Sequence, residues 1–222
     1  MEEAIAIEQS DKLKIDVGQI IREWWEIIVL QDLYASPLGK DLIFRGGTAL
    51  RLAYNSPRFS QDLDFSVIQT VDYKLFEKTI KDIEAKYDEL SVKDLADKYH
   101  TYLAEFRIKE PWRQIALSLK IELSKRVARL RKDKDYIGAI LKSPVSNLEI
   151  IGNVATIEKI IEEKKEALNS RRLPRDVFDL WYLSQTLRID LNYGKGTIPQ
   201  GRLRQELRKF LPRNFYQVID QL

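Results

Sequence analysis

Residues 41–67 set the fold class of this chain. The short apolar run 41–45 stops at Gly46 and Gly47, and the residues that follow, up to Tyr54, carry apolar side chains at helical spacing. This order predicts a strand, a tight glycine turn and a helix. After a polar loop, residues 63–67 alternate apolar and polar side chains, which predicts a second strand with one polar face.

The rest of the chain separates into a mixed part and a helical part. Periodicity predicts the segments as follows: helices over 16–34 and 72–87, strands over 102–108 and 115–123, then helices over about 156–169, 174–187 and 202–211. Residues 91–100 have no clear pattern. We therefore predict an α/β (α+β) core with a small mixed sheet flanked by helices over 1–145, and a helical C-terminal subdomain over 146–222.

The residue types exclude several kinds of chemistry. The chain has no cysteine and one histidine, so disulfide scaffolds, zinc ribbons and Ser-His-Asp triads lack their parts. Catalysis would have to rest on Asp, Glu, Lys and Arg. The chain has no apolar run of about 18 residues or more and no signal-like start, which predicts a cytoplasmic protein that does not enter a membrane.

Three carboxylates form the strongest candidate site. Asp62 and Asp64 are two positions apart in a predicted strand, so their Cβ atoms lie on one face about 6–7 Å apart. Glu122 lies on the polar face of the predicted strand 115–123, and a neighbouring strand would bring it beside the pair. Mg²⁺ prefers oxygen ligands of this kind. The alternative for the aspartates is a solvated strand edge.

A candidate phosphate site precedes the aspartates. Gly46 and Gly47 let backbone N–H groups approach a phosphate at the start of a helix, and Thr48 adds a hydroxyl donor. Two glycines alone are most often a plain turn. Strand, Gly-Gly-Thr, helix, loop and Asp-x-Asp in this order nevertheless predict a nucleotide pocket.

Further charged residues are candidates for the same pocket. Lys164 lies on the apolar stripe of its helix, where it either snorkels to solvent or presents a cation to a triphosphate. Arg45 and Arg58 flank the expected pocket and either bind phosphates or lie at the surface. Asp176 and Asp179 follow Pro174 at a helix start, where structural and functional roles are equally open. Arg175 and Asp179 are spaced as an i,i+4 ion pair.

The positive charge gathers at the C-terminal end. The formal net charge of the whole chain is +3, yet six basic and two acidic residues follow position 194. The stretch 194–199 is the best linker candidate before this tail. Such a tail either binds a polyanion or is a solvated helix face.

Several segments resemble a known family. Residues 44–50 (FRGGTAL), 58–65 (RFSQDLDF), 120–122 (KIE), 163–168 (EKKEAL) and 175–180 (RDVFDL) are similar to the AbiEii/AbiGii abortive-infection toxins of the DNA polymerase β-like nucleotidyltransferase superfamily. The resemblance covers about residues 40–185 and adds Ser60, in the second segment, to the candidate site. It departs from the superfamily pattern at Thr48, where a serine is usual, and at Glu122, where an aspartate is usual.

The resemblance implies a polymerase β-like core and a metal-dependent nucleotidyltransferase. Asp62, Asp64 and Glu122 would hold two Mg²⁺ ions, and an NMP group would pass from an NTP to an acceptor hydroxyl. The acceptor implied is RNA, with a tRNA end as one candidate, and the role is the toxin of a type IV toxin–antitoxin system with a cognate antitoxin. Two alternatives stay open: a small-molecule nucleotidyltransferase of the aminoglycoside-modifying kind, and a non-catalytic nucleotide- or RNA-binding module.

Overall fold

The structure is a computed structural model that describes residues 1–127 and 129–222. In these residues helices and strands follow one another in this order: α1 (Glu3–Leu13), α2 (Val17–Ala35), the 3-10 turn η1 (Gly39–Asp41), β1 (Leu42–Arg45), α3 (Gly46–Tyr54), β2 (Asp62–Val67), α4 (Tyr73–Glu84), β3 (Leu90–Asp97), β4 (Thr101–Ile108), β5 (Leu117–Val127), β6 (Tyr136–Ser143), β7 (Ser146–Ala155), α5 (Ile157–Arg171), α6 (Pro174–Leu187), α7 (Gln200–Leu207), the 3-10 turn η2 (Arg213–Phe215) and α8 (Tyr216–Ile219).

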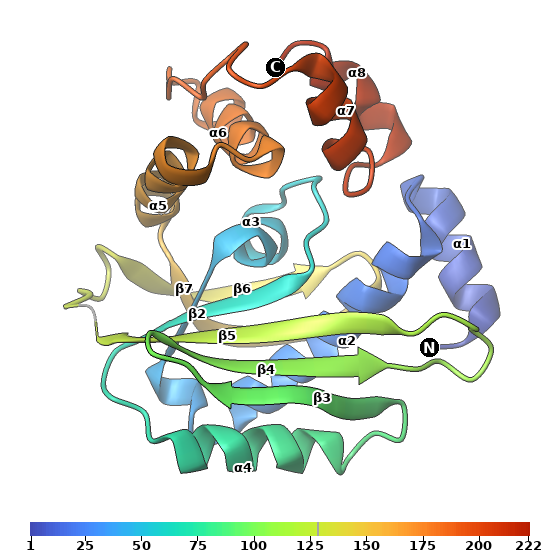
Figure 1. Ribbon diagram of the computed structural model, residues 1–222, viewed down its shortest axis with the longest axis vertical. Helices are drawn as coiled ribbons and strands as arrows, with labels where there is room; N and C mark the ends of the chain where they lie inside the picture. The colour runs from blue at the N-terminus through green and yellow to red at the C-terminus, as the bar shows by residue number, and fades with distance from the viewer. Residues whose placement is uncertain (128) are drawn as a thin grey trace.

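A single mixed sheet organises the chain (Figure 1). Its strand order is β3-β4-β5-β2-β1-β7-β6. The pairs β2–β5 and β1–β7 are parallel, and the other neighbours are antiparallel. In Figure 1, α5 to α8 gather above α3 at the top, whereas α4 lies below β3 at the bottom. The predicted mixed α/β core with C-terminal helices is thus confirmed, with seven strands in the sheet.

Two large apolar clusters and a small third one fill the interior of the described part of the chain. The larger one joins the sheet to α2 and α4, with Trp25, Phe65 and Phe76 among its fully buried side chains. The second one joins α3 to the C-terminal helices, through residues such as Leu50 and Phe178. Strand β2, which carries the candidate aspartates, is the central strand of the sheet and lies between two packed layers, which hold it in a fixed position.

Strands β3, β6 and β7 were not predicted from the sequence, because local features interrupt their patterns. β3 occupies most of the unassigned stretch 91–100, and a register shift between Val92 and Asp94 interrupts its alternation. Strands β6 and β7 form a hairpin that turns at Pro144 and Val145. Glycines interrupt the pattern of both strands, and Gly152 is required because a Cβ there would lie 2.4 Å from the Tyr34 ring. Helix α1 was also not predicted.

The sheet continues past residue 145, where the sequence places the end of the core. A boundary between residues 145 and 146 would cut the β6–β7 hairpin, and β7 pairs with β1 inside the sheet. The change from sheet to helices comes at Thr156, which caps α5 by accepting a hydrogen bond from the Lys159 amide. Strand β5 also continues to Val127, beyond the predicted strand end at residue 123.

The basic tail is part of the core and is not an appended segment. Leu203 and Leu207 of α7 and Ile219 of α8 are buried in the second cluster. Ile198, in the predicted linker, is buried there as well. Of the helices described, none has both the length and the apolar character that a membrane crossing requires.

Candidate active site

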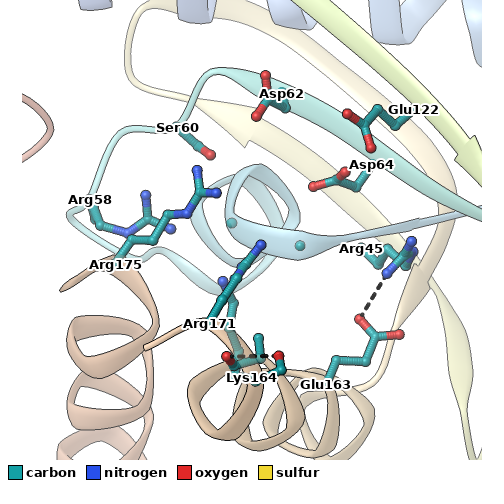
Figure 2. Close-up of a pocket in the computed structure, with 14 residues that line it drawn as sticks. Arg45, Arg58, Ser60, Asp62, Asp64, Glu122, Glu163, Lys164, Arg171 and Arg175 are labelled. Carbon is teal, nitrogen blue, oxygen red and sulfur yellow. Dashed lines mark hydrogen bonds and ion pairs between the residues drawn. The ribbon is translucent and has the colours of Figure 1, made fainter. Parts of the chain in front are cut away.

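A cavity of about 350 Å³ lies where strands β2 and β5, the start of α3 and the helices α5 and α6 meet (Figure 2). Strands β2 and β5 supply one wall, and α5 and α6 supply the opposite wall. The residues that line it are Arg45, Gly46, Gly47, Arg58, Ser60, Asp62, Asp64, Glu122, Glu163, Lys164, Ala167, Ser170, Arg171 and Arg175.

The three candidate carboxylates share the strand wall. Strands β2 and β5 run parallel side by side, with Asp64 in register with Glu122 and Asp62 in register with Lys120. In Figure 2 the carboxyl groups of Asp62, Asp64 and Glu122 lie together on this wall. The alternating side chains of β2 explain the arrangement, because Leu63 and Phe65 point into the core and leave the aspartates facing the cavity.

The carboxyl groups of the strand wall are partly buried and repel one another. Burial raises the pKa of Asp62 and of Glu122, and the charge of Asp64 raises both further. In the described part of the chain no side chain donates a hydrogen bond or ion pair to these carboxyl groups. Nearby cations such as Lys120 and Arg175 lower the pKa of Asp62 only in part. A set of oxygen ligands that forms no ion pair with the described residues suits a hard divalent cation. No three Asp, Glu or His side chains of residues 1–127 and 129–222 stand at metal-binding spacing.

The glycine pair at the start of α3 serves close approach. Gly46 has φ +80°, and a Cβ there would lie 2.5 Å from Asp64 Oδ2. A Cβ on Gly47 would lie 2.4 Å from an Arg58 guanidinium nitrogen. Any other residue at either position would push Asp64 or Arg58 away, so glycine allows both charged groups to reach the helix N-terminus.

Thr48 lies beneath the cavity and does not line it. Its side chain is fully buried, and its hydroxyl donates a 2.6 Å hydrogen bond to the backbone carbonyl of Asp62. The hydroxyl of Thr48 therefore does not face the cavity, although the sequence predicted that it would donate to a phosphate there. Thr48 fixes the start of β2, and Ser60 is the hydroxyl residue that lines the cavity.

The helix wall contains a buried ion network. Lys164 Nζ lies 3.2 Å from Asp176 Oδ1 and 2.6 Å from Asp179 Oδ2. Arg58 donates two 2.7 Å hydrogen bonds to the two oxygens of Asp179, and Arg171 donates two 2.9 Å hydrogen bonds to Asp176. Both aspartates are fully buried. The snorkelling alternative for Lys164 is therefore wrong, since its ammonium group lies inside the protein.

The network overrides the local spacing of the sequence. Burial alone would raise the pKa of Asp179, but the charges and hydrogen bonds of Arg58 and Lys164 lower it to about 2. Asp179 was expected to pair with Arg175, four residues earlier on the same helix. Its partners come instead from the loop before β2 and from α5.

Three charged residues that line the cavity were not among the candidate site residues predicted from the sequence. Arg171 and Arg175 rise from the α5–α6 junction toward the strand carboxylates in Figure 2. The Nε of Arg175 is buried without a hydrogen-bond partner among the described residues. Glu163 forms a 3.5 Å ion pair with Arg45, whose own Nε is buried and also without a partner. The close spacing of Arg171, Arg172 and Arg175 around Pro174 is the signal that could have found the arginines.

Comparison with known proteins gives the family. The model of the family "Nucleotidyl transferase AbiEii toxin, Type IV TA system" matches residues 28–211, which is most of the chain. The chain belongs to the AbiEii family. It is therefore a nucleotidyltransferase toxin of a type IV toxin–antitoxin system, and the expected family is confirmed. No curated protein matches its sequence.

Solved structures show that the AbiEii fold is shared with distant proteins. MenT4, a nucleotidyltransferase toxin from Mycobacterium tuberculosis, superposes with a TM-score of 0.59 at 18% identity, over 92% of this chain and 68% of MenT4. JHP933 from Helicobacter pylori gives a TM-score of 0.57 at 22% identity, over 86% of this chain and 75% of JHP933. A putative nucleotidyltransferase from H. pylori gives 0.52 at 22% identity, over 92% and 77%. At these identities the likeness shows the fold alone.

Proposed function

We propose that this toxin transfers an NMP group from an NTP to an RNA hydroxyl, with a tRNA end as one candidate acceptor, in a reaction that requires Mg²⁺. The observation that carries the proposal is the composition of the cavity. Asp62, Asp64 and Glu122 lie on one wall, and their carboxyl groups have no hydrogen-bond or ion-pair partner among the described residues. Cations from the helices lie on the opposite wall. A metal-bound triphosphate carries both kinds of charge that these walls complement.

The carboxylates would hold the metal. Asp62, Asp64 and Glu122 offer up to six oxygen atoms, and Mg²⁺ takes only a few protein carboxylates because phosphates and water complete its shell. Two bound ions would align the α-phosphate with the acceptor hydroxyl and stabilise the pyrophosphate leaving group. Thr48, through its bond to the Asp62 carbonyl, and Gly46, through its close contact with Asp64, keep the ligands in position.

The start of α3 and the arginines would bind the phosphates. The backbone N–H groups of Gly46 and Gly47 lie at a helix N-terminus, where the field favours an anion. Arg175 and Arg45 each have a buried Nε without a partner, so each has a donor to spare. Arg58 spends its donors on Asp179 and on the Phe59 carbonyl, and thus orients the wall.

Lys164 has a double role in this proposal. An ammonium group has three N–H donors, and Asp176 and Asp179 take two of them. Since Lys164 also lines the cavity, the third donor is free for a phosphate oxygen. Asp176 and Asp179 would position Lys164 and the arginines and would not contact the nucleotide.

The charge around the cavity favours RNA over a small cationic acceptor. An aminoglycoside-like substrate needs an acidic acceptor pocket, whereas the helix wall is lined by Arg58, Lys164, Arg171 and Arg175. The partners in this proposal are an NTP, RNA and a cognate antitoxin. A non-catalytic binding module would have no use for three unpaired carboxylates beside a phosphate site.

Labelling separates these functions directly. The protein is incubated with each radiolabelled NTP and total RNA, with Mg²⁺ present or chelated, and RNA is resolved on a denaturing gel. We expect label on RNA only with Mg²⁺. Label on a small molecule, or none on RNA with any NTP, would overturn the proposed acceptor.

The role of Lys164 is tested by Lys164→Met, which keeps the apolar stem. Each aspartate retains an arginine, so the fold keeps most of its stability. We expect the Kd for NTP to rise at least about tenfold, as for loss of a charged hydrogen bond. The control is Arg202→Met, at an exposed position of α7. An unchanged Kd for NTP in Lys164→Met would show that Lys164 does not bind the nucleotide.

A further inference from the structure

A second hollow lies on the other side of the loop that enters β2. Two cavities of about 420 and 250 Å³ share three of their lining residues, Pro57 among them, and so form one groove, which we call the basic groove. Arg58 and Ser60 line the active site, whereas Pro57 and Phe59 line the basic groove. A single stretch of backbone, whose side chains alternate between the two sides, therefore separates the groove from the active site.

The groove has positive charge and no opposing acid. Lys12, Lys14, Lys142 and Arg51 line it, and no carboxylate does so in the described part of the chain. The charge of Arg51 is taken by the buried Glu23. The three lysines are exposed, and the lysine ion pairs among the described residues all involve other lysines. Three positive charges thus face solvent along one groove without partners.

Apolar surface lies between these charges. Leu13, Pro57 and Phe215 are half-buried and line the groove with the exposed Pro144. Phe59 is fully buried below them, with the Arg51 guanidinium 3.5 Å from its ring centre. Lysines combined with an aromatic and proline surface form the combination that binds single-stranded nucleic acid, since phosphates meet the charges and bases stack on the apolar faces.

The walls of the groove are tied together by the backbone. The Phe59 amide donates a 2.8 Å hydrogen bond to the Phe210 carbonyl, and the Arg213 amide donates a 2.9 Å hydrogen bond to the Lys14 carbonyl. Segments from both ends of the chain and from the centre are held in one arrangement. The groove is therefore formed before any ligand arrives, which reduces the entropy lost on binding.

We propose that the basic groove binds the single-stranded part of the acceptor RNA that leads to the reacting hydroxyl. This proposal rests on the proposed function, because it takes RNA as the acceptor. The position of the groove favours RNA over an acidic peptide. Residues 57–60 contribute side chains to both hollows, so the groove lies next to the site where an RNA that carries the reacting hydroxyl must also bind.

Binding is tested with a triple variant and a matched control. Lys12→Gln, Lys14→Gln and Lys142→Gln together neutralise the groove, and Lys40→Gln, Lys74→Gln and Lys78→Gln together neutralise three exposed lysines that line none of these cavities. Each variant removes three positive charges from a chain of formal net charge +3. Any difference between them therefore depends on position and not on total charge.

The probe is a short fluorescent oligoribonucleotide with a free 3′-hydroxyl, followed by anisotropy over a series of salt concentrations without NTP. For the groove variant we expect the slope of log K against log salt to fall by about 0.7 for each lysine that contacts a phosphate. We also expect at least about tenfold weaker binding, and a raised KM for RNA with an unchanged KM for NTP. Phe215→Leu should weaken binding about fivefold with the salt slope unchanged, because it removes only a stacking surface.

Equal loss of RNA binding in both lysine variants would overturn the proposal. Wild-type RNA binding in the groove variant, together with lost binding of a polyglutamate peptide, would also overturn it. The result is separable from the proposed function. RNA that binds in the groove but receives no label would overturn the function and leave the groove assigned. RNA labelling with an unchanged KM for RNA in the groove variant would overturn the groove and leave the function.

Discussion

The two walls of the active site carry their charges in opposite ways. On the strand wall, burial and mutual repulsion raise the pKa of Asp62 and Glu122, and no described side chain neutralises them. On the helix wall, Asp176 is held by Lys164 and Arg171, and Asp179 by Arg58 and Lys164. The strand-wall carboxylates form no ion pair with the described residues, whereas the two helix-wall aspartates are paired although they are more deeply buried.

This difference indicates what each wall is for. Unpaired carboxylates cost folding free energy, and a protein keeps such groups where an external partner completes them. Paired buried charges fix geometry, because removing either partner leaves an isolated charge inside the protein. We therefore expect substitutions of the strand-wall carboxylates to affect activity and metal binding, and substitutions of the paired aspartates of the helix wall to affect stability.

The largest effect is expected for Asp64→Asn. Asp64 lies against Gly46 and in register with Glu122, at the centre of the strand wall. Loss of its charge should lower transfer at least about a thousandfold, the upper range for removal of one preorganised electrostatic group. Thermal unfolding should change little. Label transfer and circular dichroism measure the two quantities.

The matched control for Asp64→Asn is Asp94→Asn, which changes an exposed aspartate of β3 in the same sheet. Its activity should equal that of the wild type. Substantial transfer by Asp64→Asn would contradict the assignment of the strand wall to catalysis.

The helix wall should respond in stability. Asp179→Asn leaves Arg58 and Lys164 short of their shared countercharge inside the protein. We expect the free energy of unfolding to fall by about 3–5 kcal/mol, as for other broken buried pairs. Urea denaturation measures it, with Asp220→Asn as control, since that aspartate pairs with Arg204 at an exposed site and should cost about 1 kcal/mol or less. Equal losses would show that the buried network adds nothing.

Acid should weaken the helix wall specifically. The pKa of Asp179 is lowered from 3.8 to about 2 in the folded chain, so its contribution to stability is complete above pH 4 and is lost as the pH falls toward 2. The contribution is about 2 kcal/mol. Unfolding measured between pH 5 and pH 2 should show a shallower fall for Asp179→Asn than for the wild type. Parallel curves would contradict the pairing.

The smallest effect is expected for Asp62→Asn without metal. Because the pKa of Asp62 is raised on folding, its ionisation at pH 7 opposes the folded state, and the amide removes that penalty. The free energy of unfolding should stay equal or rise slightly. Added Mg²⁺ should stabilise the wild type and have a smaller effect on the variant, which a melting curve detects. A marked loss of stability in metal-free Asp62→Asn would show that Asp62 has a protein partner.

Local sequence rules were enough for many elements. Asp16 caps α2 by accepting a hydrogen bond from the Gly18 amide, as its position at the start of an apolar stripe predicts. Alternation placed Asp62 and Asp64 on one face of β2, and the glycines marked the start of α3. These features depend on neighbours within a few residues. The β6–β7 hairpin was not predicted because Gly152 interrupts the pattern of β7. Glycine is needed there because the Tyr34 ring of α2 leaves no room for a side chain.

The sequence by itself determined the part of the strand wall formed by Asp62 and Asp64, since period-two alternation and a glycine turn define it within about twenty residues. Only the tertiary structure decided the helix wall. Arg58 and Asp179 are 121 positions apart, and no periodic pattern links them. The i,i+4 spacing of Arg175 and Asp179 predicts a local pair, but an exposed helical pair of this kind is worth only about 0.3–0.5 kcal/mol. Inside the protein Asp179 pairs instead with Arg58 and Lys164, because burial strengthens those contacts and leaves Arg175 free to face the cavity.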